Sequence, residues 1–166
     1  MNIIKRFDEL ITAWNGDEET DSKCGYCWRF VGAGRPDLFN MFQNIEESEC
    51  CIYVALFNIK FGSRYKPGDN GFTIKDHCFI SFEGFIGIPS RLDIQFYNEL
   101  GSTDQEKEES KWTILNTIQE CLGCDFLDVL CDDSGLYTPS EFTATQKINY
   151  QDSNYDGWLI KGQYNY

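Results

Sequence analysis

Runs of apolar residues and polar–apolar alternation predict strands in the middle of the chain. Cys51–Phe61 (CIYVALFNIKF) is rich in β-branched and aromatic residues, and its first half is apolar at every position. This pattern predicts a strand buried on both faces in the middle of a sheet. In residues 78–88 the side chains of two sets alternate along the chain, which predicts a second strand. Gly84 and Gly87 within it indicate a bulge or bend. Residues 91–100 alternate apolar with polar positions and predict a third, half-exposed strand.

Helical spacing of apolar residues occurs at two other places. Residues 3–14 carry such a stripe and predict an amphipathic helix that ends at Asn15-Gly16. The second stripe, which predicts a helix ending near Gly123, consists of Trp112, Leu115, Ile118 and Leu122. The charged residues 101–110 (GSTDQEKEES) are expected to form a linker before it.

Two further segments have weaker patterns. Residues 62–76 contain the turn dipeptides Pro67-Gly68 and Asn70-Gly71, and they are expected to form a long surface loop. Residues 38–42 (LFNMF) are short and apolar, which predicts one or two helical turns or an irregular segment packed on the core.

The last segment, residues 142–166, alternates in two stretches and predicts a terminal β-hairpin. Asp156-Gly157 lies before the second stretch and predicts the turn. This segment holds the densest aromatic cluster of the chain, and its members could be core or interface residues: Tyr150, Tyr155, Trp158, Tyr164 and Tyr166. We would look for subunit contacts here first.

The order of predicted elements is helix, three strands, helix and two strands. Strands clustered between separated helices predict an α+β protein. We expect a single α+β domain over residues 1–166, with a mostly antiparallel sheet of about five strands and two main helices packed on it.

The charge balance narrows the classes of function. The chain has 27 acidic against 14 basic residues, a formal net charge of −13. Such a surface repels phosphate backbones, so specific nucleic-acid binding is not expected, whereas a basic partner surface would suit it. The charged N-terminal stretch is not a signal peptide, and no run of about 18 apolar residues predicts a membrane span. We therefore expect a protein that matures in a cytosol without a membrane partner.

Catalytic and cofactor motifs are missing from the sequence. His77 is the single histidine and has no distinctive neighbour. Gly32-Ala-Gly34-Arg35-Pro36 does not match a dinucleotide-binding motif, and no phosphate-binding loop motif occurs. The carboxylates fall in predicted loops and linkers, where a solvated surface is the simpler interpretation. We expect no enzyme activity, no cofactor and no small-molecule substrate.

Eight cysteines include two C-x-x-C pairs, Cys24/Cys27 and Cys121/Cys124. The four thiols could form a tetrahedral zinc site, although the gap between the pairs is far wider than in a zinc ribbon. CGYC also resembles a thioredoxin-type dithiol, but no strand and helix are predicted around it. We expect reduced thiols that serve mainly in packing, and no bound metal.

The order of elements and the closing segment resemble the tail-terminator and neck-ring proteins of tailed bacteriophages. The matching positions are Asp152, Asp156, Gly157, Trp158 and Ile160, within a pattern that places Asp-Gly before an aromatic strand. The resemblance implies a non-enzymatic virion protein, assembled in the host cytoplasm, whose copies form a homo-oligomeric ring at the head–tail junction. Its partners would be itself and other connector or tail proteins, and DNA would pass through without specific binding.

Two other classes of function stay open. A zinc-stabilised adaptor or regulatory domain would use Cys24, Cys27, Cys121 and Cys124. An acidic DNA-mimic inhibitor would array its carboxylates on one face and capture a basic protein.

Overall fold

The structure, a computed structural model, describes residues 1–17, 21–33 and 51–166. The first helix, α1 (Ile3–Asn15), agrees with the prediction: Asn2 caps its start, and Gly16 at φ 72° ends it. Its apolar stripe buries Phe7 and Trp14. The predicted segment 38–42 lies outside the described residues.

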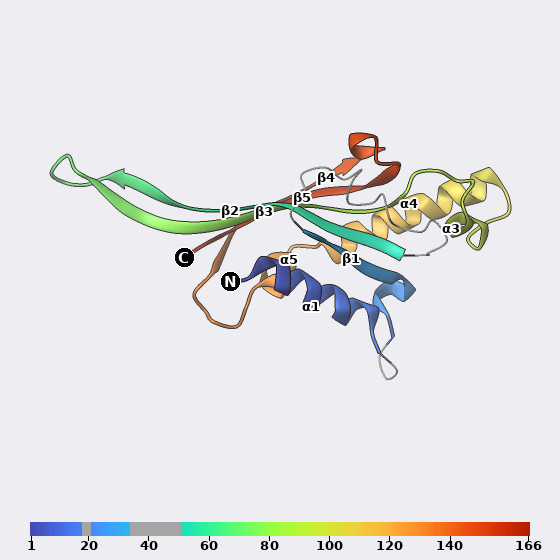
Figure 1. The fold of residues 1–166 in the computed structure, drawn as a ribbon, viewed down its shortest axis with the longest axis horizontal. Helices are drawn as coiled ribbons and strands as arrows, with labels where there is room; N and C mark the ends of the chain where they lie inside the picture. The colour runs from blue at the N-terminus through green and yellow to red at the C-terminus, as the bar shows by residue number, and fades with distance from the viewer. Residues whose placement is uncertain (18–20, 34–50) are drawn as a thin grey trace.

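Five strands form one sheet in the order β1-β2-β3-β5-β4. The strands are β1 (Cys27–Ala33), β2 (Cys51–Pro67), β3 (Thr73–Pro89), β4 (Thr138–Lys147) and β5 (Tyr155–Asn165). β1 is parallel to β2, and the other pairs are antiparallel. The α+β class and the mostly antiparallel sheet are therefore confirmed (Figure 1).

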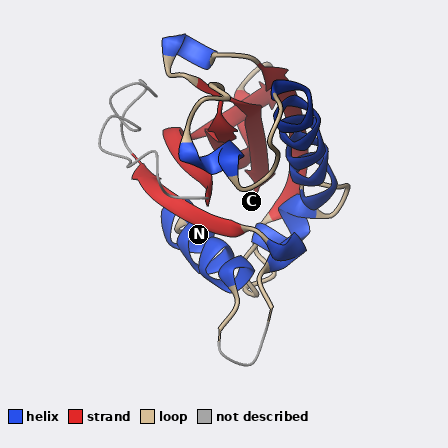
Figure 2. Ribbon diagram, turned by 90° about the vertical axis from the view of Figure 1, so that its right-hand side faces the viewer, coloured by secondary structure: helices blue, strands red, loops and turns tan. Residues whose placement is uncertain are grey.

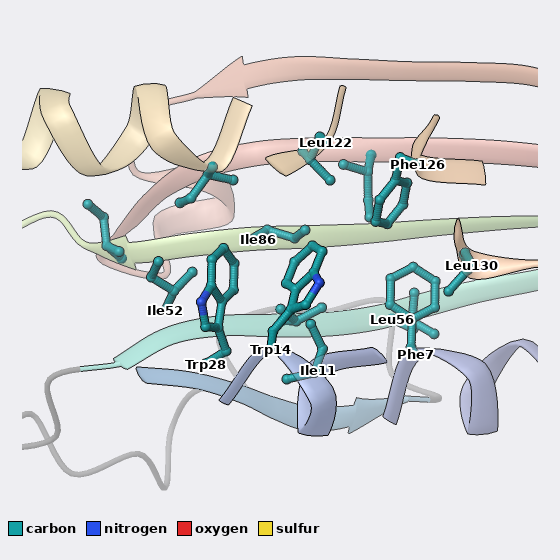
Figure 3. Packing of buried hydrophobic residues seen from close by; sticks show 14 of the residues in the cluster. Phe7, Ile11, Trp14, Trp28, Ile52, Leu56, Ile86, Leu122, Phe126 and Leu130 are labelled. Atoms are coloured by element: carbon teal, nitrogen blue, oxygen red, sulfur yellow. The ribbon is translucent and has the colours of Figure 1, made fainter. Parts of the chain in front are cut away.

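Three helices follow β3 and the loop after it. They are α3 (Gln95–Asn98), α4 (Asp104–Cys121) and α5 (Phe126–Leu130). Figure 2 shows the helices grouped around a strongly twisted sheet. The main core lies between them and the sheet, where α1 contributes Phe7 and Trp14, and α5 contributes Phe126 (Figure 3). A second, smaller cluster on the other face contains Tyr53, Phe85 and Tyr155.

Four expectations from the sequence are wrong in detail. Residues 91–100 are a turn followed by α3 instead of a strand. Ile94, just before α3, and Phe96 and Tyr97, within it, are all buried. Residues 27–33 form the edge strand β1, although no strand was expected beside the CGYC motif. Gly32 interrupts its sequence pattern, and the φ of 114° at Gly32 lies at a bulge against β2.

The other two errors concern element length. Asp104 begins α4, because Thr103 and Glu106 form a capping box that starts the helix inside the expected linker. Residues 62–76 are not a loop: β2 and β3 continue through them as a hairpin, and only residues 68–72 lie between the two strands.

The terminal hairpin is confirmed as β4 and β5, but Asp156-Gly157 is not its turn. Both residues lie in β5, with Gly157 paired to Gly87. A Cβ at Gly157 would lie 2.0 Å from the backbone oxygen of Ile86, so the close contact between β3 and β5 requires glycine there. The chain turns instead through residues 148–154, where Asn149 and Asn154 take positive φ.

Candidate interaction surface

The terminal aromatic residues are mostly part of the protein's own core. Tyr164 is fully buried, and its hydroxyl donates to the Leu127 carbonyl oxygen at 2.5 Å. The Trp158 indole nitrogen donates to the Leu115 carbonyl oxygen at 2.9 Å. Tyr155 is buried in the second cluster. Of the aromatic cluster expected to include subunit contacts, only Tyr166 is strongly exposed, at 41%.

Asp156 fixes this hairpin to the rest of the fold. Its carboxylate is fully buried, and one oxygen accepts from the Asn149 backbone N–H at 2.8 Å and from the Ser90 hydroxyl. Its other oxygen lies 3.1 Å from the ammonium of Lys111 on α4, which is itself nearly buried. Asp156, Trp158 and Ile160, three of the matched positions of the phage resemblance, therefore make contacts inside this chain's own fold.

The exposed apolar residues gather elsewhere, on the hairpin of β2 and β3. Among the described residues, β2 pairs only with β3 beyond Leu56, and residues 73–77 of β3 pair only with β2. This two-stranded ribbon projects from the rest of the protein (Figure 1). We call residues 59–79 the arm and the rest of the protein the body.

The arm exposes large side chains that a lone ribbon cannot bury. Its tip residue Phe72 is 75% exposed, Phe61 is 80% exposed and Tyr65 is 63% exposed. Phe61 and Tyr65 share one face of the ribbon with Ile59, which pairs with the core residue Phe82. The face that the helices cover in the body therefore continues into the arm, where no helix covers it in the described structure.

The opposite face of the arm is ordered by its own contacts. Gly62 leaves room for the ring of Phe79, because a Cβ there would lie 2.8 Å from that ring. The guanidinium of Arg64 lies 5.6 Å from the centre of the same ring. Near the tip, the Lys66 ammonium lies 2.7 Å from the Asp76 carboxylate. The hydrogen bond from Lys66 and a second one from His77 lower the pKa of Asp76.

The arm and the rest of the chain differ in sign of charge. Residues 59–79 contain four basic residues and two acidic ones, a formal charge of +2. Because the whole chain carries −13, the rest of the chain carries −15. The basic residues are Lys60, Arg64, Lys66 and Lys75. Exposed aromatic rings interleaved with basic side chains are suited to an acidic protein surface.

One acidic surface lies at the opposite end of the molecule, at the start of α4 (Figure 1). Its first turns carry Glu106, Glu108 and Glu109, and Trp112 beside them is 44% exposed. A depression of about 370 Å³ opens there, lined by Glu106 and Glu109 together with Tyr26, Leu100, Ser110, Thr113 and Ile114. Its lining combines the apolar Leu100 and Ile114 with hydroxyl groups and two carboxylates, a surface suited to the basic and aromatic side chains of the arm.

A larger depression of about 440 Å³ lies where the arm joins the body. Polar side chains at its base already satisfy one another. The Asn58 amide donates to Glu83 at 2.6 Å, and Lys161 lies 3.0 Å from Glu83. These contacts lower the pKa of Glu83, so its carboxylate stays charged and paired. The depression offers contact area, and it contains no nucleophile–base pair.

The four cysteines of the zinc hypothesis do not come together as one set. Cys24 and Cys121 do meet, with their sulfurs 3.8 Å apart. Cys27 is disulfide-bonded, which corrects the expectation that all thiols are reduced and removes it as a thiolate ligand. Among the described residues, no group of three or more histidine, cysteine or carboxylate side chains is placed to hold a metal ion.

His77 lies on the arm, with its Nδ1 2.8 Å from the Asp76 carboxylate. Cys78 at the base of the arm has a lowered pKa, because Lys75 and Ser63 hydrogen-bond to its thiolate. Within residues 1–17, 21–33 and 51–166, no helix is both long and apolar enough to span a membrane.

Sequence reasoning missed the arm because its turn dipeptides and polar residues are typical of a loop. The available signal was the presence of Phe61, Tyr65 and Phe72 among basic residues in a stretch with no buried face. Comparison with protein-family models and with curated proteins finds no match to this chain.

Proposed function

We propose that this protein is a non-enzymatic structural subunit that assembles with copies of itself into a ring, of the neck or tail-terminator type found at the head–tail junction of tailed bacteriophages. The observation that carries the proposal is the arm. It presents exposed Phe61, Tyr65 and Phe72 with a positive charge, on a chain that is otherwise strongly acidic.

The positions of two complementary surfaces support a ring. The arm projects at one end of the long axis, and the acidic start of α4 lies at the other end (Figure 1). Two different surfaces at opposite ends of one molecule produce a head-to-tail contact, which closes into a ring when the rotation between subunits allows it. In this arrangement the arm of one subunit contacts the acidic depression beside α4 of the next.

The charge of the body suits a DNA passage. A subunit whose remaining chain carries −15 would repel the phosphate backbone, so DNA could slide through the ring without being held. The link to phage connectors rests on the sequence resemblance in element order and at Asp156-Gly157-Trp158, although Asp156-Gly157 lies within β5 and not in a turn before it. A gene located among portal, capsid and tail genes supports this part of the proposal, whereas a gene far from any virion gene contradicts it.

Light scattering after size-exclusion chromatography tests the assembly. The full chain at micromolar concentration is expected to give a closed oligomer, visible as rings by negative-stain electron microscopy. The variant Phe61→Ser/Tyr65→Ser is expected to be folded and to lose most of its affinity for itself, because buried aromatic anchors carry about 2 kcal/mol or more each at an interface.

A matched control is Leu136→Ser, which removes an apolar side chain that is 58% exposed on the body. It is expected to assemble like the unaltered chain. A monomer at every concentration and salt level tested, or an oligomer that the arm variant leaves unchanged, would overturn the proposed use of the arm.

A further inference from the structure

Two cysteines far apart in the sequence lie side by side in the fold. Cys24 sits in the short 3-10 helix η1 (Lys23–Gly25), and Cys121 is the last residue of α4. Their sulfurs are 3.8 Å apart, although 97 residues separate them in the chain. A disulfide bond has an S–S length of about 2.0 Å, so the two sulfurs need to approach each other by roughly 1.8 Å to bond.

The two thiols differ in access. Cys24 is exposed, whereas Cys121 is partly buried. Burial, together with the hydrogen bond to Cys24, raises the pKa of Cys121 to about 12. Cys121 is thus a protonated thiol at neutral pH, and it is positioned against the sulfur of Cys24. Because Cys24 is the more exposed residue, a small reagent reaches its sulfur before that of Cys121.

The other cysteines nearby do not compete in the same way. Cys27 is already disulfide-bonded, and Cys124 is exposed as a free thiol. Each C-x-x-C motif therefore contributes one residue to a contact that neither motif contains by itself.

We propose that Cys24 and Cys121 form a thiol–disulfide exchange site whose oxidant is a low-molecular-weight disulfide. The Cys24 thiolate attacks one sulfur of the reagent, the reagent's S–S bond breaks, and its first half leaves as a thiolate that takes up a proton. Cys121 then gives its proton to water and attacks the Cys24 sulfur. This step forms the Cys24–Cys121 bond and releases the second half as a thiol. The protein loses two electrons, and the reagent disulfide becomes two thiols.

The bond would tie the segment before β1 to the end of α4. The linked residues are 97 positions apart, so the crosslink closes a long loop in the unfolded chain. This lowers the conformational entropy of the unfolded state and stabilises the fold. It joins the edge strand β1 to the helix that packs across the sheet. The site does not depend on the proposed ring.

The test uses the full chain equilibrated in glutathione buffers of increasing oxidised fraction. Free thiols are then alkylated, and the digest is mapped by mass spectrometry. The expected product is a Cys24–Cys121 linked peptide. In Cys121→Ser the second step cannot occur, so glutathione is expected to remain bound to Cys24. Cys124→Ser is the matched control and is expected to leave the linked peptide unchanged.

Thermal unfolding supplies a second readout. The oxidised chain is expected to melt about 5–15 °C above the reduced chain. The variant Cys24→Ser/Cys121→Ser measures how much of that shift comes from the disulfide at Cys27. Alkylation of both Cys24 and Cys121 in fully oxidised buffer, or a link from Cys24 to Cys124 in place of Cys121, would overturn the proposal. A linked peptide without a shift in melting temperature would overturn the stabilising role.

Discussion

Two antiparallel hairpins of the described structure have similar sequence character, but one is covered by helices and the other is exposed. Both are rich in aromatic residues, and both contain glycines and turn dipeptides. The hairpin of β4 and β5 places Trp158, Ile160 and Tyr164 against the helices. The arm continues the same face of the same sheet and leaves Phe61 and Tyr65 in water. The difference is whether a helix covers the strand.

The comparison separates two meanings of an aromatic strand. In the β4–β5 hairpin, the polar tips of Trp158 and Tyr164 donate to backbone carbonyl oxygens of α4 and the segment around α5. Such internal hydrogen bonds satisfy buried polar atoms, as a core requires. The arm, by contrast, exposes apolar side chains and carries a positive charge, and no helix covers its aromatic rings in the described structure. Core aromatics should therefore affect stability, and arm aromatics should affect assembly.

The largest effect is expected from Asp156→Ala. The change leaves the Lys111 ammonium nearly buried without its closest carboxylate, which costs about 3–5 kcal/mol of unfolding free energy. Urea denaturation followed by circular dichroism measures the loss. The exposed residue Asp133 provides the control, and Asp133→Ala is expected to stay within about 0.5 kcal/mol of the unaltered chain. A small effect at Asp156 would mean that the β4–β5 hairpin is not fixed by this contact.

A smaller loss is expected from Tyr164→Phe. It removes the hydroxyl that donates to the Leu127 carbonyl oxygen and leaves that acceptor buried, at a cost of about 1–3 kcal/mol. The matched change Tyr166→Phe affects an exposed ring that lies tilted against Tyr137 and should cost less than about 0.5 kcal/mol. Equal effects at the two positions in chemical denaturation would contradict the division into core and surface.

Charge reversal on the arm should act mainly on assembly. Arg64→Glu is expected to weaken self-association about tenfold at low salt, because in the proposed ring it places a negative charge against the acidic surface of the next subunit. Lys5→Glu on α1 makes the same change in net charge at an exposed position of the body, and it should have little effect. Sedimentation at several protein and salt concentrations gives both values. A response that is the same for the two variants would remove the arm from the interface.

The smallest effect concerns the pair at the end of the arm. The hydrogen bonds from Lys66 and His77 lower the pKa of Asp76 in the folded protein. Its contribution to stability is therefore present above the pKa of the unfolded chain and is lost as pH falls through the lower folded value. NMR titration of side-chain carboxyls should show Asp76 protonating below pH 3.8, and Lys66→Met should move its pKa upward. An unchanged pKa in that variant would mean that the pair does not form in solution.

The sequence predicted elements best where burial imposes a period. α1 and the β4–β5 hairpin were found because apolar positions recur at helical or alternating spacing, and the first half of β2 was found because it is a continuous apolar run. The arm was missed because both of its faces are exposed, so no alternation marks residues 63–67 as strand. Edge strand β1 was missed because only Trp28 within it is buried and Gly32 interrupts it. The start of α4 was misread as a linker, although Thr103 and Glu106 carried a capping signal.

The candidate surfaces were harder to predict than the fold. The meeting of Cys24 with Cys121 depends on how β1 and α4 pack, which no local pattern encodes. The same holds for the Lys111–Asp156 pair, because a lysine and an aspartate in separate elements give no signal until both are buried. The charge contrast between arm and body was present in the sequence, but it becomes meaningful only when residues 59–79 are recognised as one projecting unit.

The strand order has a consequence for how the chain folds during synthesis. β5 is translated after β4, yet it lies between β3 and β4 in the sheet. Until residues 155–165 leave the ribosome, the backbone of β3 around Phe85 and Ile88 lacks its partner strand β5. An uncovered apolar edge can pair with other chains. A nascent chain that stalls before β5 should therefore need a chaperone, whereas in the complete fold β5 pairs with this edge of β3.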